Sequence, residues 1–139
     1  MGQDVLVLVD KGQLSYFRRK ARQSRNEIMA LLVGKQESSN LILVYRFEYP
    51  ELVVSTPIEV KSDTQSTSDI EQRAKDEGLS VVGSIHSHPN APIYMSQQDL
   101  RSHRVHRDKI SGICEVTPKR TFIAFWQDKN PVPCDWDYF

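Results

Sequence analysis

The segment Leu79–Pro89, "LSVVGSIHSHP", constrains the fold more than any other part of this 139-residue chain. Its β-branched residues predict a strand, and Pro89 cannot donate to a sheet ladder, so the chain must leave the sheet there. In an extended chain, residues i and i+2 point to the same side. We therefore expect His86 and His88 to present both imidazoles to one point at the end of a strand, with Ser87 facing away.

Helical patterns alternate with short apolar runs along the rest of the chain. Leu14, Phe17 and Ala21 fall at i, i+3 and i+7, which is the apolar stripe of a helix. Ser68-Asp69-Ile70-Glu71 fits a capping box, and Gly78 fits a helix stop. They predict a second helix over about Ser68–Glu77, and a third is expected to begin near Ser96. Strands are predicted at Val5–Val9, Ile28–Gly34, Leu41–Tyr49, Ile58–Val60, Leu79–His86, Ile110–Thr117 and Thr121–Gln127.

These elements predict a single α/β domain with one mixed central sheet flanked by about three helices. The length of the chain fits one compact domain. We place this domain at residues 1–127. Residues 128–139, which include Pro131 and Pro133, are expected to form a tail that lies on the surface or hangs free.

The bulk composition excludes several classes of protein. Lys plus Arg equals Asp plus Glu, 18 against 18, so there is no net positive charge to attract nucleic acid. Cys114 and Cys134 are expected to be free thiols of a reducing compartment. The apolar run Val5–Val9 has five residues, too few for a signal peptide or a membrane span. We expect a cytoplasmic protein that binds neither nucleic acid nor a membrane.

The histidine pair suits zinc, which favours four ligands and binds nitrogen at about 2.0–2.1 Å. Asp99 is the candidate third ligand, because the ten residues between it and His88 allow a loop that turns back and one helical turn. Two histidines and one carboxylate leave a tetrahedral position open for water, which is typical of a catalytic site. Ser96 and Asp99 also fit a helix N-cap without any chemistry. The two interpretations are compatible.

The stretch "HSHPNAPIYMSQQD" resembles the signature of the JAMM zinc metalloproteases, also called MPN-plus or JAB. "NEIMALLVG" resembles the family segment that carries a glutamate after the first helix, and "AKDEGLSVVGSIHSHP" resembles the approach to the signature strand. The similarity covers about residues 5–127. It implies the cytidine-deaminase-like fold of that family and one Zn²⁺ per chain, held by His86, His88 and Asp99.

The resemblance also implies the roles of other side chains. Glu27 would be the general base and acid that moves a proton from water to the leaving amine, and Ser96 would stabilise the oxyanion. Strand alternation, rather than the resemblance, points Ser87 away from the metal, so its expected role is at most support of the ligands from outside the metal site. The sequence alone does not distinguish one carboxylate from another, and the match to the family segment is what selects Glu27 from a larger set: Glu27, Glu37, Glu48, Glu59 and Glu115.

The implied activity is cleavage of the peptide or isopeptide bond after the C-terminal glycine of a ubiquitin-like protein, as in a deubiquitinase. The short chain resembles the prokaryotic or phage branch, in which sulfur-carrier proteins and phage tail proteins are alternative substrates. A non-catalytic scaffold is the second hypothesis. A Ser-His-Asp hydrolase using Ser87 or Ser96 is disfavoured, because two histidines on one side of a strand have no role in a triad.

Overall fold

The computed structural model describes residues 5–89, 109–127 and 132–139 of the chain. Within these ranges lie two helices, α1 (Lys11–Gln23) and α2 (Thr64–Asp76). The strands within the same ranges are β1 (Leu6–Val9), β2 (Met29–Ser38), β3 (Leu41–Glu48), β4 (Leu52–Ser55), β5 (Val60–Ser62), β6 (Ser80–Pro89), β7 (Ile110–Val116), β8 (Thr121–Gln127), β9 (Val132–Pro133) and β10 (Asp135–Tyr138).

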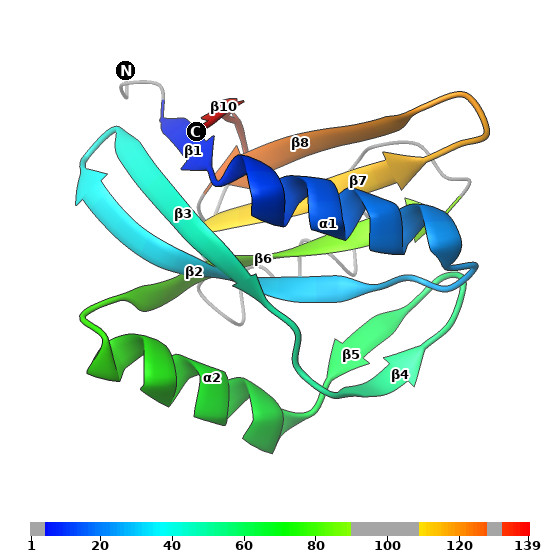
Figure 1. Ribbon diagram of the computed structural model, residues 1–139, viewed down its shortest axis with the longest axis horizontal. Coiled ribbons are helices and arrows are strands. Elements are labelled where there is room, and N and C mark those ends of the chain that lie inside the picture. Colours follow the sequence, from blue (N-terminus) through cyan, green and yellow to red (C-terminus); the bar gives the residue numbers. More distant parts are fainter. Residues whose placement is uncertain (1–4, 90–108, 128–131) are drawn as a thin grey trace.

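Among the described residues, the main sheet has eight strands in the order β10-β1-β3-β2-β6-β7-β8-β9, and β4 pairs with β5 in a separate small sheet (Figure 1). The β1–β10, β1–β3 and β6–β7 pairs are parallel, whereas β2 runs antiparallel to both of its neighbours. The sheet is therefore mixed, and the predicted α/β class is confirmed. The helix predicted to begin near Ser96 lies outside the described residues.

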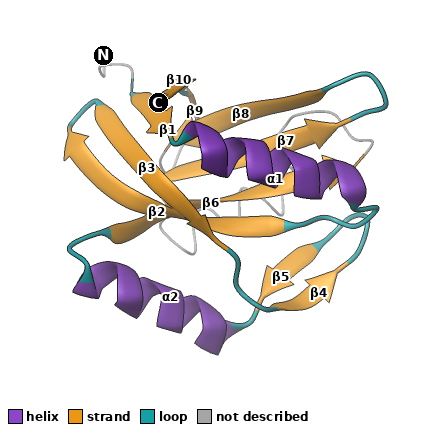
Figure 2. Cartoon of the chain, viewed as in Figure 1, coloured by secondary structure: helices purple, strands orange, loops and turns teal. Residues whose placement is uncertain are grey.

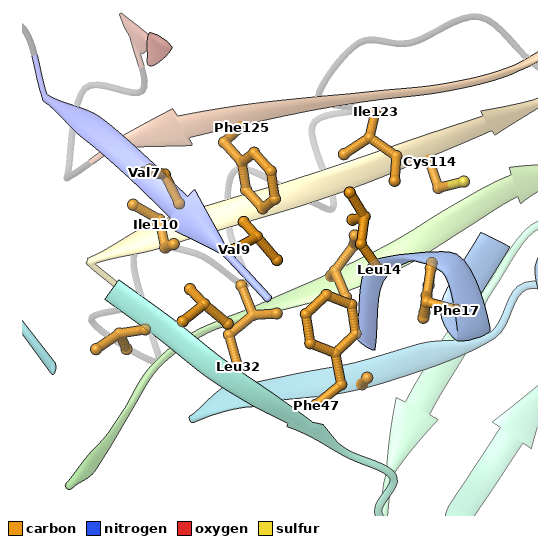
Figure 3. Close-up of a cluster of buried hydrophobic side chains, with 14 of the residues drawn as sticks. Val7, Val9, Leu14, Phe17, Leu32, Phe47, Ile110, Cys114, Ile123 and Phe125 are labelled. Carbon is orange, nitrogen blue, oxygen red and sulfur yellow. The ribbon is translucent and has the colours of Figure 1, made fainter. Parts of the chain in front are cut away.

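Helix α1 covers one face of the main sheet (Figure 2). Its N-cap is Asp10, whose carboxylate accepts a hydrogen bond from the backbone N–H of Gln13 at 3.0 Å. The predicted stripe of Leu14, Phe17 and Ala21 is buried. These side chains pack into a core drawn from β1, β2, β3, β6, β7 and β8 (Figure 3). Burial of one such aliphatic or aromatic side chain stabilises the fold by about 1.5–3 kcal/mol.

Helix α2 packs on the opposite face. Leu31 and Val33 of β2 form a second cluster with Ile70 and Ala74 of the helix. Leu32, which lies between those two β2 residues, belongs to the core beneath α1. Because neighbouring residues of a strand point to opposite faces, the two helices lie on opposite sides of the sheet.

Helix α2 begins earlier than the sequence predicts. The carboxylate of Asp63 accepts a hydrogen bond from the backbone N–H of Ser66 at 2.9 Å, so Asp63 is the N-cap. Ser68, the predicted cap, lies inside the helix. A side chain acts as a cap only where the preceding chain is not helical, and here residues 64–67 are. The helix stop is confirmed, because Gly78 follows the C-cap with φ 77°.

Two other segments differ from expectation. Where the sequence predicts a single strand at Ile58–Val60, the structure has the antiparallel pair of β4 and β5. Strand β2, predicted to end at Gly34, continues to Ser38 because it pairs with β3 along that length.

Residues 132–139 do not hang free as a tail. Strand β9 pairs with β8, and β10 pairs in parallel with β1. Phe139 donates its N–H to the carbonyl of Val9 and accepts from the N–H of Lys11, both at 2.9 Å. Cys134 and Trp136 pack against the core beneath α1, and this burial holds the segment on the sheet. No helix in the described ranges is long and apolar enough to cross a membrane.

Candidate metal centre

Strand β6 brings the two signature histidines together. Their Nε2 atoms are 3.0 Å apart, and their ring centroids are 4.9 Å apart. His88 is buried, with 6% of its surface exposed, and His86 is partly exposed. The strand is longer than predicted and ends at Pro89, so both histidines lie within it. Their positions i and i+2 place both rings on one side.

A β-bulge decides which face of the sheet carries the histidines. Leu32 of β2 pairs with Gly83, and Val33 pairs with Val81, so β6 has one extra residue at this point. After the bulge, Ile85 points into the core beneath α1. His86 instead lies beside Met29 of β2, which packs against the cluster of α2. The histidines therefore lie on the face that α1 does not cover.

Ser87 points away from the histidines, and its side chain is fully buried. Its hydroxyl accepts a hydrogen bond from the backbone N–H of Ile28, and its own N–H donates to the carbonyl of Ile28, both at 2.9 Å. At this point the hydroxyl accepts the hydrogen bond that a backbone carbonyl of β6 would accept in a regular sheet. Both backbone groups of the residue that follows Glu27 are thus fixed to β6.

Glu27 is buried, with 8% of its surface exposed. Its backbone N–H donates to the carbonyl of Thr56 at 2.7 Å, and its carbonyl accepts from the hydroxyl of Ser55 at 3.0 Å. The end of β4 and the residue after it therefore hold the backbone of Glu27 on one side, while Ser87 of β6 holds Ile28 on the other. Ser55 and Thr56 could not be identified from sequence patterns, because they lie 28 and 29 positions after Glu27 and contact it only through the fold.

Burial narrows the choice among the five glutamates that the sequence left open. Glu27 and Glu115 are buried, at 8% and 7% exposed. The other three, Glu37, Glu48 and Glu59, are at least partly exposed. Glu115 lies on β7 directly beside His88 of β6. Two of the five carboxylates thus lie in the neighbourhood of the histidines.

Within the described part of the chain, the two histidine nitrogens fit zinc but do not complete its ligand set. Two nitrogens bound to one tetrahedral zinc lie about 3.3 Å apart, given bond lengths of about 2.0–2.1 Å. The observed 3.0 Å is close to that value. It also fits an N–H···N hydrogen bond between the rings. Ser96 and the predicted third ligand Asp99 lie outside the described residues, and within those residues no group of three His, Cys, Asp or Glu side chains could hold a metal.

Comparison with known proteins agrees with the resemblance seen in the sequence. Residues 11–130 match the Prok-JAB family, described as prokaryotic homologs of the JAB domain. The fold is similar to the solution structure of protein DSY2949 from Desulfitobacterium hafniense, with a TM-score of 0.76 and 19% identity over 96% of this chain and 92% of that chain. A search of curated proteins found no match. Because the family match spans most of its length, the chain belongs to the Prok-JAB family.

Proposed function

We propose that this protein is a zinc-dependent metallopeptidase or isopeptidase that cleaves after the C-terminal glycine of a ubiquitin-like protein. The observation that carries the proposal is the approach of His86 Nε2 and His88 Nε2 to 3.0 Å within a Prok-JAB domain. His86, His88 and Asp99 would hold the metal. Glu27 is buried, and the backbone of the next residue, Ile28, is bonded to the same strand, which supports Glu27 as the general base.

The chemistry divides between the metal and the protein. Zinc held by His86, His88 and Asp99 would act as a Lewis acid toward the scissile carbonyl and would lower the pKa of water to about 7. Glu27 takes a proton from the attacking water and gives it to the leaving amine. Its backbone is held by hydrogen bonds, which reduces the conformational freedom that Glu27 has to lose during the reaction. Ser96 donates a hydrogen bond to the oxyanion.

The position and exposure of the small sheet of β4 and β5 support the proposal that the substrate binds as an extended chain. It lies next to Glu27, which bonds to Ser55 and Thr56 at the end of β4. Val53 and Ile58 in this region are 63% and 84% exposed, unusual values for aliphatic side chains. An extended tail can add to such a sheet as a further strand, with apolar contacts for its side chains. A thin C-terminal tail of a ubiquitin-like, sulfur-carrier or phage tail protein has the required shape.

Metal content and cleavage test the proposal together. The purified protein is expected to contain about one zinc per chain and to release a fluorogenic amine from the C-terminal glycine of a ubiquitin-like protein. Glu27→Gln should retain the zinc and lose cleavage by about 10²–10⁴-fold, the usual contribution of a general base. Glu51→Gln is the matched control, because Glu51 is exposed and precedes the same small sheet.

The other outcomes separate the alternatives. Wild-type protein without zinc would favour the non-catalytic scaffold. Cleavage that resists a chelator but stops with a serine-directed reagent would favour a serine hydrolase. Equal cleavage by Glu27→Gln and the wild type would remove Glu27 from the proton transfer.

A further inference from the structure

A cavity lies between the end of α1 and the C-terminal ends of β6 and β7, which lie together at one end of the molecule (Figure 1). Among the described residues it is lined by Arg22, Ser24 and Arg25, by Pro89 of β6, and by residues 116–118. Its volume is about 440 Å³, within the range of about 300–1,000 Å³ that is usual for ligand sites. The charged groups of this lining are both arginines, so the cavity favours an anion.

The two arginines belong to a segment with an uneven charge. Residues 11–26 contain six Lys or Arg and no Asp or Glu, although the whole chain has zero net charge. The ion pairs within the described ranges use cations elsewhere in the chain, namely Lys35, Arg46, Arg73 and Arg120. A bound anion would therefore supply the cavity with a counter-charge that these ranges do not provide.

The helix dipole explains only part of this charge. Cations in the last turn of a helix stabilise its C-terminus, and Arg22 lies in the last turn of α1. Arg25 lies beyond the helix, because the C-cap Ser24 has an extended backbone with φ −110° and ψ 135°. The dipole effect falls off within the last turn, so it does not account for Arg25.

Hydrogen bonds order the surroundings of both arginines. Arg22 Nη1 donates to Thr121 Oγ1 of β8 at 2.8 Å. The Ser24 hydroxyl donates to the carbonyl of Asn26 at 2.9 Å and accepts from its N–H at 3.1 Å, which fixes the turn that carries Arg25. Both arginines are exposed, so a ligand can reach them. The planar guanidinium group matches the two oxygens of a carboxylate.

We propose that this cavity binds acidic side chains of the protein substrate on the leaving side of the cleaved bond. The inference rests on the proposed function. Arg25 precedes the proposed general base Glu27 by two residues, and Pro89 directly follows His88. The small sheet of β4 and β5 holds Glu27 from the other direction. A chain whose tail lies along the small sheet would pass Glu27 and His88 and then reach the cavity.

Peptide binding is the first readout and needs neither zinc nor cleavage. The anisotropy of a fluorescein-labelled hexaglutamate peptide should rise when the wild type is added, whereas that of a labelled hexaglutamine peptide should not. The double variant Arg22→Gln, Arg25→Gln should bind hexaglutamate at least about tenfold more weakly, because charge-assisted hydrogen bonds to the peptide are lost. Binding to the wild type should also weaken as the salt concentration rises.

The matched control, Arg19→Gln with Lys20→Gln, removes the same charge from the same helix. Both side chains lie over tyrosine rings instead of lining the cavity: Arg19 is 5.9 Å from the centroid of Tyr16, and Lys20 is 5.2 Å from that of Tyr49. The control should change the peptide affinity by less than about threefold, because more distant charges act through a screened field. An equal loss in both double variants would show attraction to α1 as a whole and overturn the cavity site. Competition by inorganic phosphate as strong as that by unlabelled hexaglutamate would overturn the acidic-peptide assignment.

Cleavage is the second readout. A ubiquitin-like protein is fused through its C-terminal glycine to a short segment of glutamates or of glutamines. The wild type should cleave the acidic fusion with a KM about tenfold lower and a similar kcat, because the contact adds binding that the transition state shares. The ratio of the two KM values should fall to about one in Arg22→Gln, Arg25→Gln and persist in the control variant. Equal KM values in the wild type would contradict the substrate role.

The outcomes separate this inference from the proposed function. If the wild type contains zinc and cleaves but binds hexaglutamate no better than hexaglutamine, the cavity site is wrong and the metallopeptidase proposal stands. If it neither holds zinc nor cleaves, the proposed function and the substrate role both fail, and hexaglutamate binding still decides whether the cavity is an anion site. Circular dichroism shows whether each variant is folded. Arg25→Gln alone provides the test if the double variant does not fold.

Discussion

The two faces of strand β6 differ sharply although they share one backbone. Ile85 and Ser87 are fully buried on the side that α1 covers. His86 and His88 lie on the other side, and His86 is partly exposed. The side beneath α1 is held by aliphatic packing and by the bonds of Ser87 to Ile28. The packed face beneath α1 keeps the histidine face in position, which the proposed metal site requires.

Strand β7 repeats the same contrast one residue apart. Burial raises the pKa of the Cys114 thiol to about 12, so the group stays protonated and unreactive beneath α1. Glu115, the next residue, is paired with Arg120 on the histidine side. Each face of the central sheet therefore has its own chemistry, and substitutions should affect one face at a time.

The largest expected effect is on the histidine face. His88→Ala should lose both zinc and cleavage, because a ligand nitrogen is removed while the core beneath α1 remains. Metal content after dialysis and a cleavage assay on the folded variant would show this. Full zinc occupancy in the variant would exclude His88 as a ligand.

Truncation of a side chain beneath α1 should lower the stability of the fold and leave zinc binding unchanged. Phe17 is fully buried against the sheet, and Phe17→Ala should lower the free energy of unfolding by about 3–5 kcal/mol. Urea titration would measure the loss. Zinc content of the folded variant should equal that of the wild type, and a parallel loss of zinc would show that the two faces are coupled.

Ser87→Ala should affect both faces of the sheet, with a loss of stability smaller than that of Phe17→Ala. Removal of the hydroxyl leaves the partly buried N–H of Ile28 without its acceptor, at a cost of about 1–3 kcal/mol. Cleavage should fall more than zinc affinity, because Glu27 adjoins Ile28. Ser38→Ala, which removes an exposed hydroxyl bonded to Asn40, should change the free energy of unfolding by no more than about 0.5 kcal/mol.

The smallest effect is expected from the thiols. Burial raises the pKa of Cys114 from 9.0 to about 12 and that of Cys134 from 9.0 to about 11. The unfolded chain therefore loses these protons first, and stability should fall as the pH rises above 9 toward 12. Urea midpoints at pH 8 and pH 10 should differ less in Cys114→Val than in the wild type. An identical difference would contradict a buried thiol.

Local patterns were enough to predict much of the fold. The stripe of Leu14, Phe17 and Ala21 and the end of α2 before Gly78 follow from residues close together in the sequence. The start of α2 could not be predicted in this way. Ser68 and Asp63 are both suitable N-cap residues, and the conformation of the chain before each of them determines which one caps the helix. Strand β10 depends on a partner more than a hundred residues earlier, so its own sequence suggested a tail.

The candidate site shows the same limit. Alternation predicted that His86 and His88 share a side, and the structure brings their Nε2 atoms to 3.0 Å. The bulge at Val81 and Val82 that sets their face arises from pairing with β2. Asp99 and Ser96 stay predictions.

Strand β10 has a consequence for solubility. Within the described residues it forms one edge of the main sheet and covers β1, a run of leucine and valine only. Its Asp135 and Asp137 are exposed, and a short, acidic edge strand disfavours pairing with another molecule. Detachment of β10 would expose the backbone of β1 as a template for intermolecular strands. Loss of the β10–β1 pairing should therefore cause self-association, while the histidines on the distant strand β6 remain in place.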